Sequence, residues 1–228
     1  MASVASVRAF EIVAVGLWLY GAAWAARSRD PVRCGVYFGS STLTAFDWVF
    51  NTNWFFRVTY DPRFISLWSI EGVTQPLAIA CNYGFYFGLP VLLLVGRRAW
   101  IDRRLGRLGP LAVFALGVAL EPLADLPAVR LGLWKYHQAP AFTLAGVPWS
   151  MFWYSGLLTV ACYASARLAT RWAAMPLPEP GPRADRERWW RGFVFGVGAV
   201  WCAFYVCLNL QLVWYALARP WVPGPRPF

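Results

Sequence analysis

Two acidic residues lie four positions apart within an apolar stretch of the sequence. Glu121 and Asp125 would occupy one face of a helix, because residues four apart are neighbours on a helix surface. Two carboxyl groups in one dry site rarely ionise together, so one can keep and donate its proton while the other accepts one. The pair therefore predicts acid–base chemistry in an apolar environment.

Other polar residues extend this predicted site. Asp47 and Asn51 are also four apart, and Glu71, Gln75 and Asn82 follow helical spacing along one expected stripe. We expect Asp47 and Glu71 to join the first pair as catalytic groups, removing a proton or orienting water. We expect the three amides to bind substrate.

The composition around these residues is typical of a membrane protein. Hydrophobic residues make up 59% of the 228 residues and charged residues only 14%. We predict a single all-α domain, a polytopic membrane bundle of six transmembrane helices, with a seventh if residues 52–70 contain a short helix. Six apolar segments are long enough to cross a bilayer, namely Ala9–Ala26, Cys34–Asn51, Glu71–Gly96, Leu108–Val129, Val147–Ala169 and Gly192–Leu217.

The arginines predict an orientation in the cell membrane. Most of them fall in the first, third and fifth loops, which the positive-inside bias places in the cytoplasm, with both termini outside. The fifth loop, residues 170–191, is rich in Pro and Arg and is predicted to be a flexible cytoplasmic connector. All four predicted catalytic acids then fall in the outer half of the bundle.

A structural interpretation of the acids stays open. Charged residues in membrane helices usually face an interior cavity, but near a helix end they can reach the interface or pair with arginine. Glu11 and Asp61, close to the predicted surface, fit that structural role best. For Glu121 and Asp125 a shared face and a shared turn favour a site.

Several chemistries lack the residues they need. His137 is the only histidine, which argues against bis-histidine haem and against a histidine-based metal site. The five cysteines lack CxxC spacing and are expected to be small buried hydrophobes. Glycine-rich nucleotide motifs and a basic stripe for nucleic acid are also missing. We therefore expect no metal, no cofactor and no nucleic-acid partner.

Acid–base chemistry on an apolar molecule remains. Protonating an alkene or epoxide gives a carbocation, and the faces of aromatic rings stabilise cations. Aromatic residues make up 18% of the chain, although many of them are expected to anchor the protein at the interface.

One stretch resembles the membrane carotenoid-biosynthesis families. It contains Glu121-Pro-Leu-Ala-Asp125, then Gly132-Leu-Trp134-Lys-Tyr136, then Gly146-Val-Pro148-Trp149. The pattern is similar to that of carotenoid hydratases and small-subunit lycopene cyclases. It consists of an acid on a helix, a G-x-W-x-Y turn and a G-V-P motif at the start of the next helix. The chain has Trp149-Ser150 where the cyclases usually have paired acids. Its size and helix-borne acids also resemble the small membrane terpene cyclases.

This resemblance implies an all-helical enzyme that adds a proton to isoprenoid double bonds. It points to Glu121 and Asp125 as acid or base and to Trp134 and Tyr136 at the mouth of a substrate site, with Trp149 as a further binding residue. The predicted function is protonation-initiated cyclisation or hydration of a lipophilic polyene or prenylated substrate. The alternatives are a lipid-binding or proton- or cation-coupled transport protein, and a structural subunit of a membrane complex.

Overall fold

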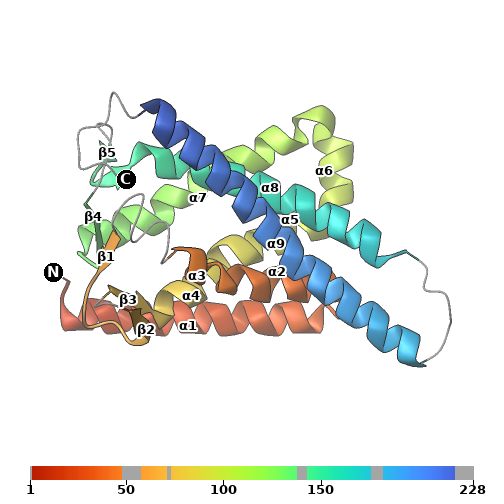
Figure 1. The fold of residues 1–228 in the computed structure, drawn as a ribbon, viewed down its shortest axis with the longest axis horizontal. Coiled ribbons are helices and arrows are strands. Elements are labelled where there is room, and N and C mark those ends of the chain that lie inside the picture. The colour runs from red at the N-terminus through yellow and green to blue at the C-terminus, as the bar shows by residue number, and fades with distance from the viewer. Residues whose placement is uncertain (1, 48–57, 71–72, 138–142, 176–181, 219–228) are drawn as a thin grey trace.

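The computed structural model describes residues 2–47, 58–70, 73–137, 143–175 and 182–218, and it is 80% helical (Figure 1). The helical elements are α1 (Val4–Arg27), α2 (Pro31–Thr42), α3 (Thr44–Asp47), α4 (Leu77–Tyr83), the π-helix η2 (Gly84–Gly88), α5 (Leu89–Gly96), α6 (Arg98–Leu105), the 3₁₀ turn η3 (Gly106–Leu108), α7 (Gly109–Arg130), α8 (Trp149–Ala173) and α9 (Pro182–Ala218). The strands are β1 (Val58–Tyr60), β2 (Ser66–Ile70), β3 (Val73–Pro76), β4 (Trp134–Tyr136), β5 (Thr143–Leu144) and β6 (Val147–Pro148).

In the part of the chain that the structure describes, four helical stretches are long and apolar enough to cross a membrane. They are α1, the continuous stretch from α4 to α5, the stretch from α6 to α7, and most of α9. Only 22% of the most apolar part of α1 is buried inside the molecule. Such an exposed apolar helix suits a lipid environment better than water.

Among the described residues, the second and fifth of the six predicted spans are not matched by a helix that is long and apolar enough to cross a membrane. The second predicted segment contains α2, whose 12 residues reach only about 18 Å, followed by the four-residue α3. The fifth contains α8, which has 25 residues but is not among the four apolar stretches. In residues 58–70, where a seventh helix was considered, the structure has strands β1 and β2.

Two predicted boundaries are wrong. The third segment does not begin as a helix near residue 71, because residues 73–76 form β3 and Pro76 precedes the first turn of α4. The predicted loop 170–191 is largely helical, since α8 continues to Ala173 and α9 begins at Pro182. Proline is favoured in the first helical turn, where its missing N–H needs no partner.

Three two-stranded antiparallel sheets, which an all-α prediction did not include, lie at one end of the bundle (Figure 1). The pairs are β1 with β4, β2 with β3, and β5 with β6. The β1–β4 pair joins segments far apart in the sequence, with Val58 opposite Tyr136 and Tyr60 opposite Trp134. These short sheets hold the connections between helices in place beside the ends of α1 and α7.

Small residues allow the helices in the middle of the bundle to pack closely. A Cβ atom at Gly35 of α2 would lie 2.9 Å from the Cα of Gly196 in α9, and one at Gly39 would lie 2.9 Å from the Cα of Val197. Glycines four apart on one helix face are a common means of close helix contact in membranes. The short α2 is thereby held against α9 in the interior.

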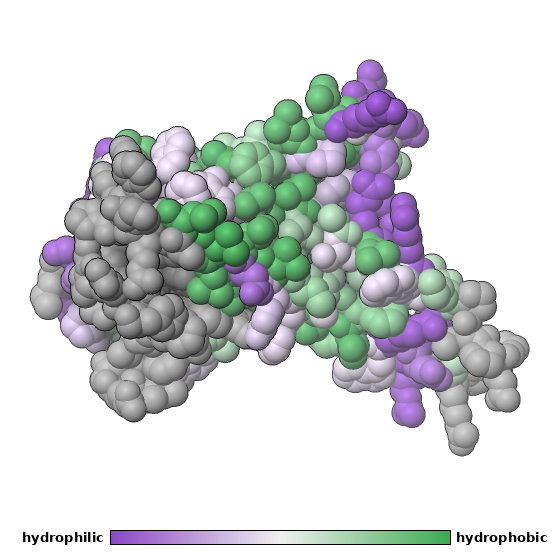
Figure 2. Space-filling view, turned by 45° about the horizontal axis from the view of Figure 1, so that its top comes forward, coloured by the Kyte–Doolittle hydropathy of each residue, from purple (hydrophilic) through white to green (hydrophobic). Residues whose placement is uncertain are grey.

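The surface divides into an apolar band and a charged end (Figure 2). Hydrophobic side chains cover the middle of the molecule, and hydrophilic ones gather at the end that contains α6 and the start of α9. Large apolar residues that are exposed in the structure include Ile12, Leu17, Leu111, Leu123 and Val206. A continuous apolar surface of this kind is typical of contact with lipid.

Candidate functional site

Helix α7 carries the predicted acid pair on its buried face. Gly117, Glu121 and Asp125 follow one another at intervals of four residues and are all buried. Pro122 and Pro127 lie inside the same helix, which removes two backbone N–H donors near the carboxyl groups. Membrane helices tolerate such prolines where neighbouring elements satisfy the freed carbonyl groups. The burial of Glu121 and Asp125 confirms the prediction that both acids lie on one interior face of the helix.

A cavity of about 60 Å³ lies next to these two carboxyl groups. It has room for a few water molecules or for one end of a longer ligand, because a water needs roughly 10–15 Å³ on this measure. Aromatic rings form much of its wall. The lining residues are Val58, Tyr60, Ile79, Asn82, Tyr83, Tyr86, Phe87, Glu121, Ala124, Asp125, Trp134, Tyr136, Met151 and Tyr154.

Glu121 accepts a hydrogen bond from a tyrosine on the neighbouring helix. The hydroxyl of Tyr86 lies 2.7 Å from Oε2 of Glu121 and 3.2 Å from Oγ of Ser155 on α8. Tyr86 is in the π-helix η2, four residues before Pro90. A proline ring clashes with the carbonyl four residues earlier, and a widened turn relieves that clash. π-Turns of this kind are frequent at functional sites.

Asp125 has a tyrosine donor of its own, from a strand. The hydroxyl of Tyr136 in β4 donates a 2.5 Å hydrogen bond to Oδ2 of Asp125. Side chains alternate along a strand, so Trp134 and Tyr136 line the cavity while Lys135 between them is exposed. Burial, and then the nearby charge of Asp125, raises the pKa of Tyr136 well above its usual value. The phenol therefore stays protonated and acts as a donor.

The two carboxyl groups also interact with each other electrostatically, and both interact with Tyr86 and Tyr136. Glu121 is 4% exposed and Asp125 is 7% exposed, so water screens these interactions little. A buried acid pair with two phenol donors can bind one proton between its members and release it to a ligand.

Close packing between α7 and α8 positions Glu121. A Cβ at Gly117 would lie 2.7 Å from the carbonyl oxygen of Ser155 and 2.8 Å from the Cα of Gly156. On the other helix, a Cβ at Gly156 would lie 2.7 Å from Cγ2 of Val118. The two backbones can be this close only because both positions are glycine. Ser155 is thereby brought beside the Tyr86–Glu121 hydrogen bond.

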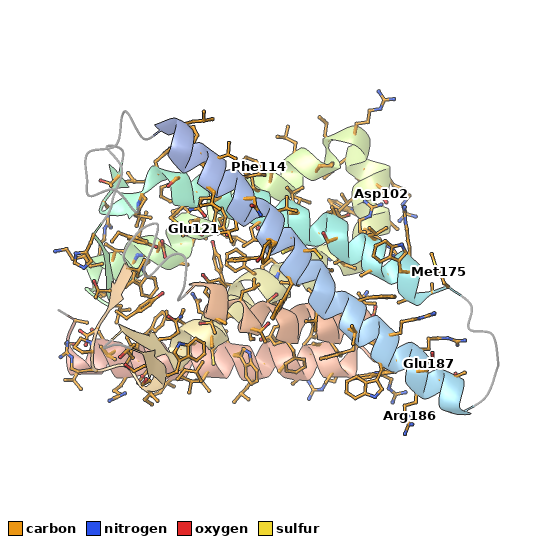
Figure 3. All side chains as sticks on the ribbon, in the orientation of Figure 1. Asp102, Phe114, Glu121, Met175, Arg186 and Glu187 are labelled. Carbon is orange, nitrogen blue, oxygen red and sulfur yellow. The ribbon has the colours of Figure 1, made fainter. Side chains whose placement is uncertain are left out.

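The structure brings together some of the predicted site residues. Glu121, Asp125, Asn82, Trp134 and Tyr136 all line the one cavity. Glu121 lies toward the end with the sheets, whereas Asp102, Arg186 and Glu187 lie toward the opposite end (Figure 3). The separation of the acid pair from the charged loops agrees with the prediction that they occupy different halves of the bundle.

Two other predicted binding residues are elsewhere. Gln75 does not share a helical stripe with Asn82, because it lies in β3, where its Nε2 donates a 2.7 Å hydrogen bond to Oγ1 of Thr44. Trp149 is 60% exposed at the start of α8 and packs edge-on against Phe152, so it does not contribute to the cavity wall.

The side chains of three predicted site residues are not described by the structure. Asp47 is the last residue of α3, but its side chain is not described. Asn51 and Glu71 also lie outside the described residues. Their predicted roles stay predictions.

Glu11 and Asp61 have structural partners. Oε1 of Glu11 accepts a 2.5 Å hydrogen bond from the backbone N–H of Ile65, and its other oxygen pairs with Arg8. Asp61 accepts two hydrogen bonds from the Arg63 side chain, at 2.8 and 2.6 Å, and one from the N–H of Ala2. Both acids fasten the segment before β2 to α1, as the structural interpretation expected.

Sequence reasoning missed four tyrosines around the acids, of which Tyr86 contacts Glu121. Tyr60, Tyr83, Tyr86 and Tyr154 line the cavity but were not predicted. The available signal was the run from Tyr83 to Pro90, in which three aromatic residues, Phe85 to Phe87, stand between two glycines shortly before a proline. Among the described residues, no three His, Cys, Asp or Glu side chains lie close enough to hold a metal ion.

Comparison with known proteins gives no family for this chain. No family model matches it, and neither a protein of described function nor a solved structure matches it.

Proposed function

We propose that this protein is a membrane-embedded enzyme of isoprenoid metabolism that starts cyclisation or hydration of a polyene or prenylated lipid by protonating it. The observation that carries the proposal is the buried Glu121–Asp125 pair, each member hydrogen-bonded by a tyrosine hydroxyl at an aromatic cavity. This site offers a proton, an acceptor for a proton and an apolar surrounding.

The reaction balances without a cofactor. One carboxyl group transfers its proton to an alkene carbon or an epoxide oxygen, which leaves a carbocation and a carboxylate. In cyclisation a second double bond of the substrate attacks the cation, and loss of a proton from the ring restores the acid. In hydration a water molecule attacks, and the proton that it releases restores the acid.

Aromatic rings around the acids fit the charge of the intermediate. The rings of Tyr60, Tyr83, Phe87 and Trp134 line the cavity, and a contact between a cation and the face of an aromatic ring is worth about 0.5–2 kcal/mol. The cavity is too small for a whole polyene, so we propose that only the reacting end of the substrate enters it. The remaining chain would lie along the apolar surface of the helices.

The membrane arrangement is part of the proposal. We propose six crossings, in which α2 with the residues after it and α8 join the four apolar stretches. The arginine-containing end would face the cytoplasm of a cell membrane, with both termini outside. The acid pair would then lie in the outer half of the bilayer.

A comparison of lipid extracts tests the proposed activity. The full chain is produced in cells that make polyene and prenylated lipids, and extracts with and without it are compared by mass. A product isomeric with its precursor indicates cyclisation, and one heavier by one water indicates hydration. Glu121→Gln and Asp125→Asn should each remove the product while the protein remains folded.

Matched controls make the test specific. Glu187→Gln and Asp185→Asn repeat the same substitutions at exposed positions of α9, and both should leave the product unchanged. Product that persists in both cavity variants would overturn the enzymatic proposal and would favour lipid binding or proton-coupled transport.

A further inference from the structure

Helix α6 lies at the end of the molecule where hydrophilic side chains gather (Figures 1 and 2). Its apolar contacts include Ile101, which is 4% exposed and lies close to Gly109 at the start of α7, and Leu105, which is partly buried against the core. Asp102 fixes it to α8 through two hydrogen bonds from Arg167, at 2.9 and 2.8 Å. The helix is therefore held against the bundle, and Arg98, Arg103 and Arg104 on it are exposed.

The exposed side of this segment carries positive charge without acidic partners. Arg98, Arg103, Arg104 and Arg107 are exposed, and none of them forms an ion pair with a described residue. The nearby acid, Asp102, is occupied by Arg167. The charge of the four guanidinium groups is therefore available to a partner outside this part of the chain.

The position of the segment identifies that partner. Exposed Leu108 and Leu111 follow the arginines directly at the start of α7, and Trp100 of α6 is 52% exposed. Tryptophan beside an apolar band marks the level of lipid headgroups. Guanidinium groups bind phosphate through paired hydrogen bonds, and basic clusters next to a membrane helix attract anionic lipids.

We propose that the α6–η3 surface, defined by Arg98, Arg103, Arg104 and Arg107, binds the headgroups of anionic phospholipids. This surface is at the opposite end from the acid pair, so the proposal does not depend on the proposed enzymatic function. Anionic lipid around α6 would hold the protein at a fixed depth and orientation in the bilayer.

Lipid selectivity measured in nanodiscs tests this proposal. The purified full chain is placed in phosphatidylcholine containing a small fraction of labelled phosphatidylcholine or labelled phosphatidylglycerol, and the bound label is quantified. The wild type should prefer phosphatidylglycerol by at least about tenfold at low salt, because each arginine near the surface contributes about fivefold, these factors multiply, and screening reduces the product. The variant R103Q/R104Q/R107Q should lose most of this preference.

A control at the other end separates local binding from net charge. Arg130→Gln combined with Lys135→Gln also removes exposed positive charge, but at the end with the sheets, and should keep the preference. Unchanged thermal unfolding of the triple variant in pure phosphatidylcholine would show that it is folded; if it unfolds, the single variants R103Q and R107Q are compared. Equal binding of both lipids by the wild type, or a preference that survives in the folded variants, would overturn the proposal.

Discussion

Tyr136 and Asp125 form a 2.5 Å hydrogen bond that joins a strand of the β1–β4 sheet to the buried face of α7. Tyr86 and Glu121 form the corresponding 2.7 Å bond between the π-helix η2 and the same face of α7. Each carboxyl group thus has its own phenol donor, and the two donors come from different elements. The two halves of the site can therefore be perturbed separately.

Tyr136→Phe tests the half of the site around Asp125. The substitution keeps the ring and removes the hydroxyl, which leaves the buried carboxyl group without this donor at a cost of about 1–3 kcal/mol. We expect a lower free energy of unfolding in detergent and at least a tenfold loss of any product formed. Tyr20→Phe is the matched control, because Tyr20 is 64% exposed on α1, and it should change neither quantity. Equal behaviour of the two variants would contradict the role of Tyr136.

Gly117→Ala tests the close packing that positions Glu121. The added methyl group would meet the backbone of Ser155 and Gly156, neither of which can move without separating α7 from α8. We expect about 1–3 kcal/mol of destabilisation, measured by chemical unfolding in detergent. Gly198→Ala in α9 is the control, because nothing lies within 4 Å of its Cβ position, and it should be neutral or stabilising. A neutral Gly117→Ala would show that the helices have room to separate.

The sequence was sufficient for features that depend on helical periodicity. The four-residue spacing of Glu121 and Asp125 predicted their common buried face, and the apolar runs predicted α1, α7 and most of α9. It also predicted that Trp134 and Tyr136 would lie near the acids, through the resemblance rather than through any spacing rule. Local periodicity and composition carry this information within a single segment.

Contacts between distant segments could not be predicted in the same way. Tyr86 donates to Glu121 from a π-helical turn that precedes Pro90, and glycines on α7 and α8 bring Ser155 beside the same hydroxyl. Gln75 was placed on a helix because its spacing is compatible with one, but pairing between β2 and β3 determines its position. Neither effect leaves a periodic pattern in the sequence.

Asp61 should make stability depend on pH in the acid range. The Arg63 side chain holds the pKa of Asp61 at about 2, below its ordinary 3.8. Because the pKa is lower in the folded state, the ionised Asp61 carboxylate adds to the free energy of unfolding. This stabilisation is complete above about pH 5 and is lost as the pH falls toward 2. Asp61→Asn should lower the free energy of unfolding at neutral pH by about 1–2 kcal/mol and reduce its fall in acid. If the free energy of unfolding of Asp61→Asn falls in acid as steeply as that of the wild type, this account is contradicted. Glu187→Gln is the control and should behave like the wild type.

Gln211 provides a test in the opposite direction, because its replacement should stabilise the protein. The side chain is fully buried in α9, and neither its Nε2 nor its Oε1 has a hydrogen-bond partner among the described residues. A buried polar group without a partner costs about 1–3 kcal/mol, so Gln211→Met, which keeps the length of the side chain, should raise the free energy of unfolding by about 1–2 kcal/mol. Gln75→Met is the contrasting variant, since Gln75 is equally buried but donates to Thr44, and it should destabilise. Chemical unfolding of both variants in detergent measures the difference, and destabilisation by Gln211→Met would show that a bound water or ligand satisfies its amide.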